Sequence, residues 1–151
     1  MHILVVGGGM GGTILANNLA RRLSGELEQG SSKITMLSAS DKHMYQPGLL
    51  YVAVGKMSTT ELYRDQKSLL EPSIDFHVDP VEKFDLDNNS VTTKSGKKIS
   101  YDIICIATGS RGNAAGIPGL AENACQFYTE ADALAMYKKL QKFEGGKVVV
   151  A

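Results

Sequence analysis

The chain has 151 residues, of which 43% are hydrophobic and 21% charged, proportions that suit one globular domain with a buried core. Its 16 basic and 16 acidic residues cancel, which leaves no basic field for nucleic acid, and no apolar run approaches the roughly 20 residues of a membrane-spanning helix. The two cysteines, Cys105 and Cys125, lack the spacing of a zinc site, so we expect no metal site and reduced thiols in a cytosolic setting.

The first predicted elements are a strand at residues 3–6 and a helix from about Met10, joined by a glycine-rich turn. Gly7, Gly9 and Gly12 fall at G-x-G-x-x-G spacing. The first glycine permits a tight turn, the second lets a pyrophosphate approach the backbone, and the third lets helix and strand pack closely. A helix N-terminus behind them offers N–H groups and a partial positive charge. This context indicates a dinucleotide site rather than a glycine turn that binds nothing.

The helix is expected to run over residues 10–23 and to stop at Ser24 and Gly25, with a polar loop at 26–32. Residues 33–38 then form the second predicted strand. Together these segments make one β-α-β half of a dinucleotide fold.

The end of the second predicted strand lacks the acidic residue that usually holds the adenosine ribose. Ser38, Ala39 and Ser40 stand there instead, and the first acid is Asp41. Serine hydroxyls can also bond a ribose, although more weakly than a carboxylate does.

The next stretch contains turn and cap signals. Residues 43–51 bend at Pro47 and Gly48 and are expected to form a structural loop. Residues 58–61 (S-T-T-E) have the pattern of a capping box, which predicts a helix that continues to Leu70.

The apolar period changes to two from residue 75, which predicts a third strand at 75–78. Three alternating stretches separated by turn signals then predict an antiparallel meander at residues 81–86, 90–94 and 99–101. The continuous apolar run 102–107 predicts another buried parallel strand, with Cys105 as an inert core residue.

The last third predicts a loop, a helix and a new strand. Residues 116–119 begin the loop, and T-E-A-D at 129–132 caps a helix that ends at about Lys142. Residues 147–151 read as the start of a new buried strand, and we expect the chain to be the first part of a longer protein.

The order of these motifs resembles the FAD half of the pyridine-nucleotide–disulfide oxidoreductase superfamily, especially sulfide:quinone oxidoreductases and flavocytochrome c sulfide dehydrogenases. Y-Q-P-G at 45–48 with A-V-G at 53–55, the stretch 89–102 and A-T-G at 107–109 carry the likeness, which covers nearly the whole chain. The glycine and A-T-G motifs mark only the superfamily, and the Y-Q-P-G region is similar in type II NADH dehydrogenases.

The resemblance implies an α/β, Rossmann-like FAD/NAD(P)-binding fold. A central parallel sheet would carry helices on one side and the three-stranded antiparallel meander on the other. Residues 1–151 would be the FAD-binding domain, an N-terminal fragment of a longer flavoenzyme, and 147–151 the first strand of its second unit.

The same resemblance implies which residues bind FAD. Those at the pyrophosphate would be Gly7, Gly9, Met10, Gly11 and Gly12. Those at the adenosine would be Ser38, Ala39, Ser40 and, through its backbone, Val81. Those along the rest of the cofactor would be Ala107, Thr108 and Gly109, with Pro47 and Gly48 near the flavin ring.

The implied activity passes electrons from sulfide through flavin to quinone, using a cysteine pair beyond Ala151. Many members have a further cysteine where Tyr128 stands here, and Cys125 comes three residues earlier, so we expect no catalytic residue in this chain and no activity of the fragment alone. Sulfide and quinone would be the substrates of the parent enzyme, with no nucleic-acid partner and a homo-oligomer left open. The full-length protein would be cytoplasmic, or peripheral on the cytoplasmic membrane through later segments.

Two alternatives stay open. One is a type II NADH dehydrogenase-like or other NAD(P)H–flavin oxidoreductase, which takes hydride from NADH and needs no cysteines. The other is a non-catalytic nucleotide-binding module.

Overall fold

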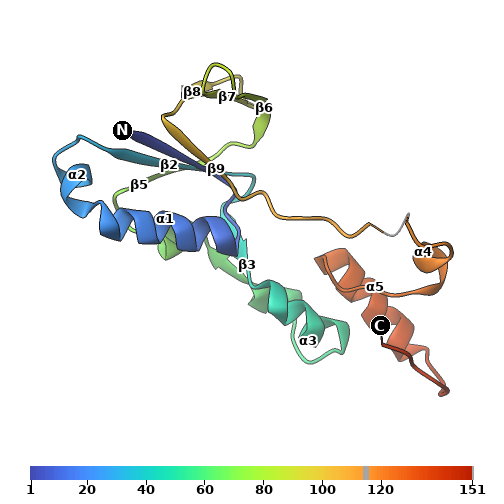
Figure 1. The fold of residues 1–151 in the computed structure, drawn as a ribbon. Helices are drawn as coiled ribbons and strands as arrows, with labels where there is room; N and C mark the ends of the chain where they lie inside the picture. Colours follow the sequence, from blue (N-terminus) through green and yellow to red (C-terminus); the bar gives the residue numbers. More distant parts are fainter. Residues whose placement is uncertain (114–115, 151) are drawn as a thin grey trace. The chain divides into compact units, whose positions relative to one another are not determined.

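The structure is a computed structural model that describes residues 1–113 and 116–150. The chain divides into two compact units (Figure 1). The first comprises Met1–Met44 and Arg64–Ser110, and the second comprises Tyr45–Tyr63 and Arg111–Ala151.

A four-stranded parallel sheet forms the centre of the first unit. Its strands are, in spatial order, β5 (Ile74–Val78), β2 (Lys33–Ser38), β1 (His2–Val6) and β9 (Ile103–Ile106). In this register Val5 of β1 lies opposite Met36 on one side and Cys105 on the other. The short β-branched runs that predicted parallel strands therefore do form one sheet, with the first strand of the chain inside it.

Helix α1 (Met10–Arg22) covers one face of this sheet (Figure 1). Ala16 and Ala20 on the helix are both buried, and their small side chains allow a close approach to the strands. The core on this face also includes Ile3, Val5, Ile34, Met36 and Ile74.

The polar segment after α1 is a second short helix, α2 (Ser24–Glu28), where the sequence predicted a loop. That prediction was wrong because the segment has an apolar anchor. Leu27 packs against the helix-side core together with Leu23, and the Leu27 N–H donates to the Leu23 carbonyl at 2.9 Å. Gly30, at φ +70°, then turns the chain toward β2.

The opposite face of the sheet packs against a three-stranded antiparallel sheet. Its strands are β6 (Val81–Asp85), β7 (Ser90–Thr93) and β8 (Lys98–Ser100). Leu4, Val6 and Leu37 meet Val91 and Tyr101 in this second core. The predicted α/β class, with helices on one side and the meander on the other, is confirmed.

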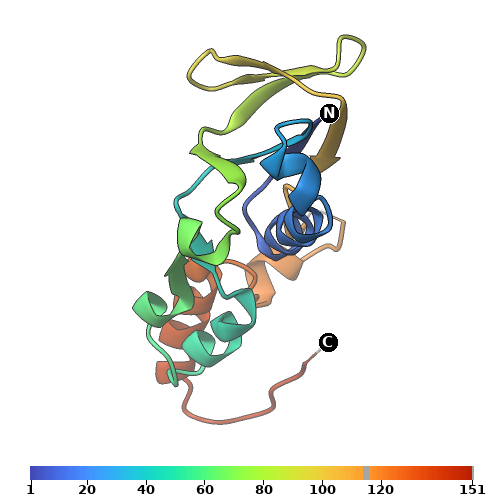
Figure 2. The same ribbon diagram turned by 90° about the vertical axis from the view of Figure 1, so that its left-hand side faces the viewer.

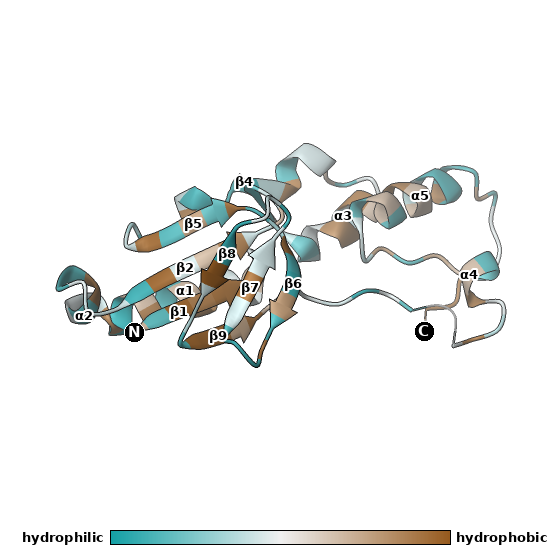
Figure 3. Ribbon diagram, turned by 90° about the horizontal axis from the view of Figure 1, so that it is seen from above, coloured by the Kyte–Doolittle hydropathy of each residue, from teal (hydrophilic) through white to brown (hydrophobic). Residues whose placement is uncertain are grey.

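Strand β9 is less buried than its apolar sequence predicted, although Figure 3 shows its hydrophobic character clearly. Ile103 is 46% exposed and Ile106 is 55% exposed. Cys105 is half-buried rather than fully buried, although it packs against the helix-side core. The reason is position, because β9 is the edge strand of the sheet in the part of the chain that the structure describes.

The single helix predicted from residue 58 to Leu70 was also wrong. The segment contains η2 (Thr59–Leu62), β4 (Tyr63–Asp65) and η3 (Lys67–Leu69), and β4 pairs with β3 (Lys42–Met44). The capping box forms, since the Ser58 N–H donates to the Glu61 carboxylate at 2.8 Å. Pairing with β3 then keeps the backbone extended, and the Asp65 carboxylate starts a new turn by accepting the Ser68 N–H at 2.7 Å.

The second unit is built from short helices, and Figure 2 shows α3 and α5 side by side. Its helices are η1 (Gln46–Gly48), α3 (Leu49–Ala53), η2, α4 (Leu120–Asn123) and α5 (Glu130–Gln141). The loops predicted over 43–51 and after residue 116 are therefore partly helical. The predicted cap of α5 is confirmed, because Thr129 and Asp132 exchange side-chain-to-backbone hydrogen bonds. The hydroxyl of Tyr63 donates to Glu130, and this bond, with partial burial, raises the pKa of Tyr63.

Residues 147–150 carry no assigned strand, and Val149 and Val150 are almost fully exposed. A strand is defined by hydrogen bonds to a neighbouring strand. That neighbour would belong to the second nucleotide-binding-like unit that the family resemblance implies, so the strand stays a prediction. Ala151 lies outside the described residues. Within them, no helix combines the length and the hydropathy needed to cross a bilayer.

Candidate nucleotide-binding site

The candidate site lies at the carboxyl edge of the parallel sheet. From β1 the chain moves to β2 and β5 on one side, and it returns through the meander to place β9 on the other side. The gap between the carboxyl ends of β1 and β9 is therefore a topological switch point, where open α/β sheets bind their ligands. The glycine loop leaves β1 at this point.

Two glycines of the loop are packed against backbone. Gly7 has φ +117°, and a Cβ there would lie 2.2 Å from the carbonyl oxygen of Ala107. A Cβ on Gly12 would lie 1.9 Å from the carbonyl oxygen of Gly7. The roles predicted for the first and third glycines, a tight turn and a close helix–strand contact, are confirmed.

Two other glycines of the loop face open space. A Cβ on Gly9 or on Gly11 would meet nothing within 4 Å. Gly9 is also the N-cap of the 13-residue helix α1, and no side chain caps that end among the described residues. Met10, the first residue of the helix, is half exposed. An open approach to an uncapped helix N-terminus fits the pyrophosphate of a dinucleotide.

Ser38 lies beside this loop at the end of β2. A Cβ on Gly8 would approach the Ser38 hydroxyl oxygen to 2.6 Å. That oxygen accepts the N–H of Ser40 at 3.2 Å, and Ser38 is buried whereas Ala39 and Ser40 are exposed. The Ser38 hydroxyl thus stabilises the turn after β2, and Ala39 and Ser40 are the residues of this turn that face solvent.

The A-T-G segment meets the loop from the other side. The Ala107 N–H donates to the Val6 carbonyl at 2.7 Å, and the Ala107 carbonyl abuts Gly7. Thr108 and Gly109 follow, both exposed. The structure therefore brings together the glycine loop, the end of β2 and the end of β9.

Val81 lies farther along, in the meander core. A cavity of about 270 Å³ opens near the segment before it, lined among others by Leu37, Asp79, Lys97 and Ile99. Hydrogen bonds from Ser95 and Thr93 lower the pKa of Asp79, and Lys97 contributes to the same shift. The contact predicted between Val81 and adenine stays a prediction.

Pro47 and Gly48 belong to the second unit, and their place at the flavin stays a prediction. Gly48 has a packing reason of its own, because a Cβ there would lie 2.5 Å from the Leu62 side chain. Pro47 is exposed in η1.

A buried polar network beneath the loop was missed by sequence reasoning. Gln66 is fully buried, and its side-chain Nε2 donates to the Thr13 hydroxyl at 2.8 Å. The Nδ1 atom of His43 lies 3.0 Å from Gln66 Oε1 and 3.1 Å from the carbonyl oxygen of Gly8. No spacing pattern in the sequence predicts this network, because its members come from α1, from β3 and from the residue before η3.

A charged cluster links the first residue of β2 to two residues of β5. Asp75 is partly buried, which opposes its charge, but hydrogen bonds from Lys33 at 2.7 Å and His77 at 2.9 Å outweigh burial and lower the pKa of Asp75. Lys33 and Asp75 lie toward the amino ends of β2 and β5, whereas His77 is the fourth residue of the five-residue strand β5. Among the described residues, no group of three acidic, histidine or cysteine side chains could hold a metal ion.

Comparison with known proteins assigns the family. The profile described as pyridine nucleotide-disulphide oxidoreductase matches residues 1–150. The chain belongs to this family. Its glycine loop, switch point and meander are thus the FAD/NAD(P)-type fold of a family member.

Individual relatives are similar over nearly all of the chain. The sulfide-quinone reductase of Aquifex aeolicus is 37% identical over 152 residues, which cover 99% of this chain and 34% of that protein. The crystal structure of the sulfide:quinone oxidoreductase from Aquifex aeolicus superposes with a TM-score of 0.76 at 33% identity, covering 93% of this chain and 32% of that one. An NADH dehydrogenase-like protein of Mycobacterium tuberculosis is 29% identical over 99% of this chain and 37% of its own length. The chain thus spans about a third of these relatives.

Proposed function

We propose that this chain is the FAD-binding part of a sulfide:quinone oxidoreductase-like flavoenzyme. The observation that carries the proposal is the glycine loop, whose Gly9 and Gly11 leave open space before an uncapped helix at the switch point of the sheet. The choice of FAD and of sulfide chemistry rests on the likeness to the Aquifex aeolicus protein over 99% of the chain.

The residues of this chain would hold the cofactor rather than react. The loop from Gly7 through Gly12, with Met10 and Gly11, would bind the pyrophosphate through backbone N–H groups. Bound flavin would supply the transfer of electrons from sulfide to quinone. The residues proposed along the rest of the cofactor are Ser38, Ala39, Ser40, Val81, Ala107, Thr108, Gly109, Pro47 and Gly48.

Sulfide and quinone are proposed as substrates of the whole protein, since this chain covers about a third of its relatives. A place on the membrane surface follows from quinone as acceptor, because quinones partition into the bilayer. It is proposed for the full-length protein alone, as is any homo-oligomer.

The first experiment purifies the protein in its full length and measures its bound flavin by absorbance and its sulfide-dependent reduction of a soluble quinone. We expect stoichiometric FAD and turnover with sulfide. Gly9→Val should remove the flavin, whereas Gly25→Val should retain it. Gly25 is the matched control, because a Cβ there also meets nothing within 4 Å but stands in α2.

The second candidate is an NADH:quinone reductase, favoured by the 29% identity to the Mycobacterium tuberculosis protein over nearly the same span. The same preparation distinguishes the two. Quinone reduction with NADH and none with sulfide would replace the first proposal by this one. Bound FAD with neither activity would leave a nucleotide-binding module.

A further inference from the structure

Three side chains meet beneath the glycine loop on the side away from the open face. Gln66 is fully buried, Thr13 is 7% exposed and His43 is half-buried. All three lie in the first unit, around the carbonyl group of Gly8. A buried side-chain amide is unfavourable unless its donors and acceptor are matched, so the partners of Gln66 are informative.

The hydrogen atoms of this network can be assigned from its acceptors. His43 Nδ1 lies within hydrogen-bond distance of two oxygen atoms that only accept, the Gly8 carbonyl at 3.1 Å and Gln66 Oε1 at 3.0 Å. Nδ1 must therefore carry the hydrogen. Thr13 accepts from Gln66 Nε2 at 2.8 Å and donates to the same Gly8 carbonyl at 3.2 Å. The result is a closed ring of bonds in which Gly8 is the common acceptor.

The ring controls the orientation of one peptide group. The C=O of Gly8 and the N–H of Gly9 belong to the same trans peptide, so they point in opposite directions. Holding the carbonyl toward Thr13 and His43 turns the Gly9 N–H toward the opposite side. The loop is also open at the next residue, since a Cβ on Gly9 would meet no atom within 4 Å.

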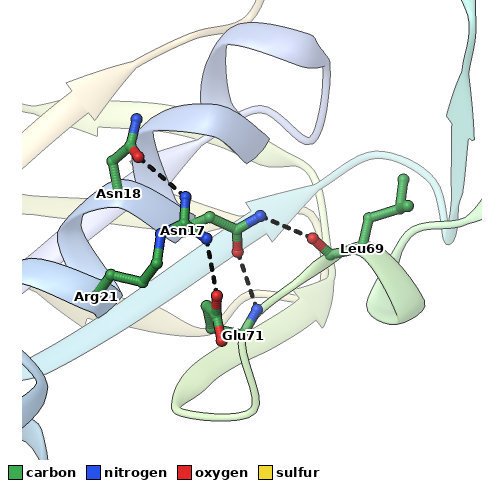
Figure 4. A network of polar contacts seen from close by, with 5 residues as sticks. All are labelled: Asn17, Asn18, Arg21, Leu69 and Glu71. Carbon is green, nitrogen blue, oxygen red and sulfur yellow. Dashed lines mark hydrogen bonds and ion pairs between the residues drawn. The ribbon is translucent and has the colours of Figure 1, made fainter.

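The backbone around Gln66 is fixed independently of the ring. Its N–H donates to the Asp41 carbonyl at 2.8 Å. Figure 4 shows the following segment bound to α1, where Asn17 donates to the Leu69 carbonyl at 2.7 Å and accepts the Glu71 N–H at 2.9 Å. The Arg21 guanidinium also forms an ion pair with the Glu71 carboxylate at 2.8 Å. Gln66 therefore projects from an anchored segment.

We propose that Gln66, together with Thr13 and His43, is a positioning residue that sets the Gly8–Gly9 peptide for binding the pyrophosphate of FAD. This inference rests on the proposed function and adds a support that the G-x-G-x-x-G motif does not contain. It predicts that removing a hydrogen bond of this network weakens FAD binding, although none of its three side chains is proposed to touch the cofactor. It also explains Gly8, where a Cβ would stand 2.6 Å from Ser38 and 3.4 Å from the Gln66 side chain.

The test uses the full-length protein and two substitutions that remove hydrogen bonds at nearly constant volume, Gln66→Met and Thr13→Val. Thr13→Ser restores the hydroxyl and serves as the rescue. Thr35→Val is the matched control, because Thr35 is 2% exposed and bonds His2 at 2.8 Å on the meander face of the sheet. The measurements are the FAD dissociation constant, the ³¹P resonances of the bound pyrophosphate and the unfolding temperature without FAD.

We expect Gln66→Met and Thr13→Val to weaken FAD binding at least tenfold and to shift the ³¹P resonances, with Thr13→Ser near the parent and Thr35→Val changing stability alone. FAD binding within twofold of the parent and unmoved resonances in Thr13→Val would overturn the inference while leaving the proposed function intact. A parent protein that binds no FAD would overturn the proposed function and this inference with it. Should Gln66→Met fail to fold, the Thr13 pair still decides between these outcomes.

Discussion

The two sides of the glycine loop use the same residue for different reasons. Gly7 and Gly12 are pressed against backbone, where a Cβ would stand 2.2 Å and 1.9 Å from carbonyl oxygens. Gly9 and Gly11 face space in which a Cβ would touch nothing. The packed pair serves the fold, and the open pair is free to serve a ligand. The glycines of this one loop therefore form two separate sets in the structure, one packed and one open.

The largest effect should come from the packed side. Gly12→Ala puts a methyl group 1.9 Å from the Gly7 carbonyl, so helix and strand must separate. Overpacking of this kind typically costs about 1–3 kcal/mol and occasionally more, and here the contact is with backbone that cannot rotate away. We expect the temperature of thermal unfolding, followed by circular dichroism in the full-length protein, to fall by a few degrees, roughly what a loss of about 3 kcal/mol produces in a protein of several hundred residues. An unchanged unfolding temperature would contradict the packing described for this glycine.

The open side should behave in the opposite way. Gly9→Val places a branched side chain where the pyrophosphate is proposed to lie, so flavin should be absent from the purified protein. The fold should survive, because valine at an N-cap position costs about 1 kcal/mol relative to preferred residues. The measurement is the flavin-to-protein absorbance ratio beside the unfolding temperature, with Gly25→Val as control. Full flavin content in Gly9→Val would show that the pyrophosphate does not bind at this loop.

A smaller effect is expected at the end of β2, where serines replace the usual acid. Ser38→Ala removes a hydroxyl that accepts the Ser40 N–H at 3.2 Å, and a neutral hydrogen bond is worth about 0.5–1.5 kcal/mol. FAD binding should weaken by about tenfold or less. Asp41→Asn should change it hardly at all, since Asp41 is exposed and its carbonyl, rather than its carboxylate, bonds Gln66. Loss of flavin in Asp41→Asn would show that the acid takes the role assigned to the serines.

The sequence predicted those features that depend on neighbours in the chain. The runs at β1, β2, β5 and β9 have the composition of parallel strands, and the alternation over β6, β7 and β8 is typical of a meander, so the layers followed. The candidate loop followed from its glycines. Features that depend on distant partners were missed. The helix expected through Leu70 is interrupted because β4 pairs with β3, and α2 forms because Leu27 reaches the core.

The polar support of the loop shows the same limit at the site itself. Thr13, His43 and Gln66 are separated by tens of residues, and each alone reads as an ordinary polar position. Only the tertiary fold brings them to the Gly8 carbonyl. Gln66 stands out in the structure because its polar side chain is fully buried. A periodic pattern of apolar residues predicts which apolar side chains are buried, and it gives no sign of a buried polar one.

The smallest effect is expected at Cys125, which lies in the second unit and is exposed. A reactive thiolate is favoured by a nearby cation or a free helix N-terminus. The helix start that follows, at α5, is already capped by the Thr129 hydroxyl and receives the Asp132 carboxylate, so its N-terminus is not free to stabilise a thiolate. The position at which the family resemblance expects a cysteine holds Tyr128.

We therefore expect Cys125→Ser to leave the kcat of sulfide-dependent quinone reduction within about threefold, whereas removal of a catalytic acid or base typically costs about 10²-fold or more. Stability should change by no more than about 0.5 kcal/mol, as at other exposed positions. A hundredfold fall in kcat with unchanged flavin content would instead place Cys125 in the reaction and give the second unit a chemical role beside the binding role of the first.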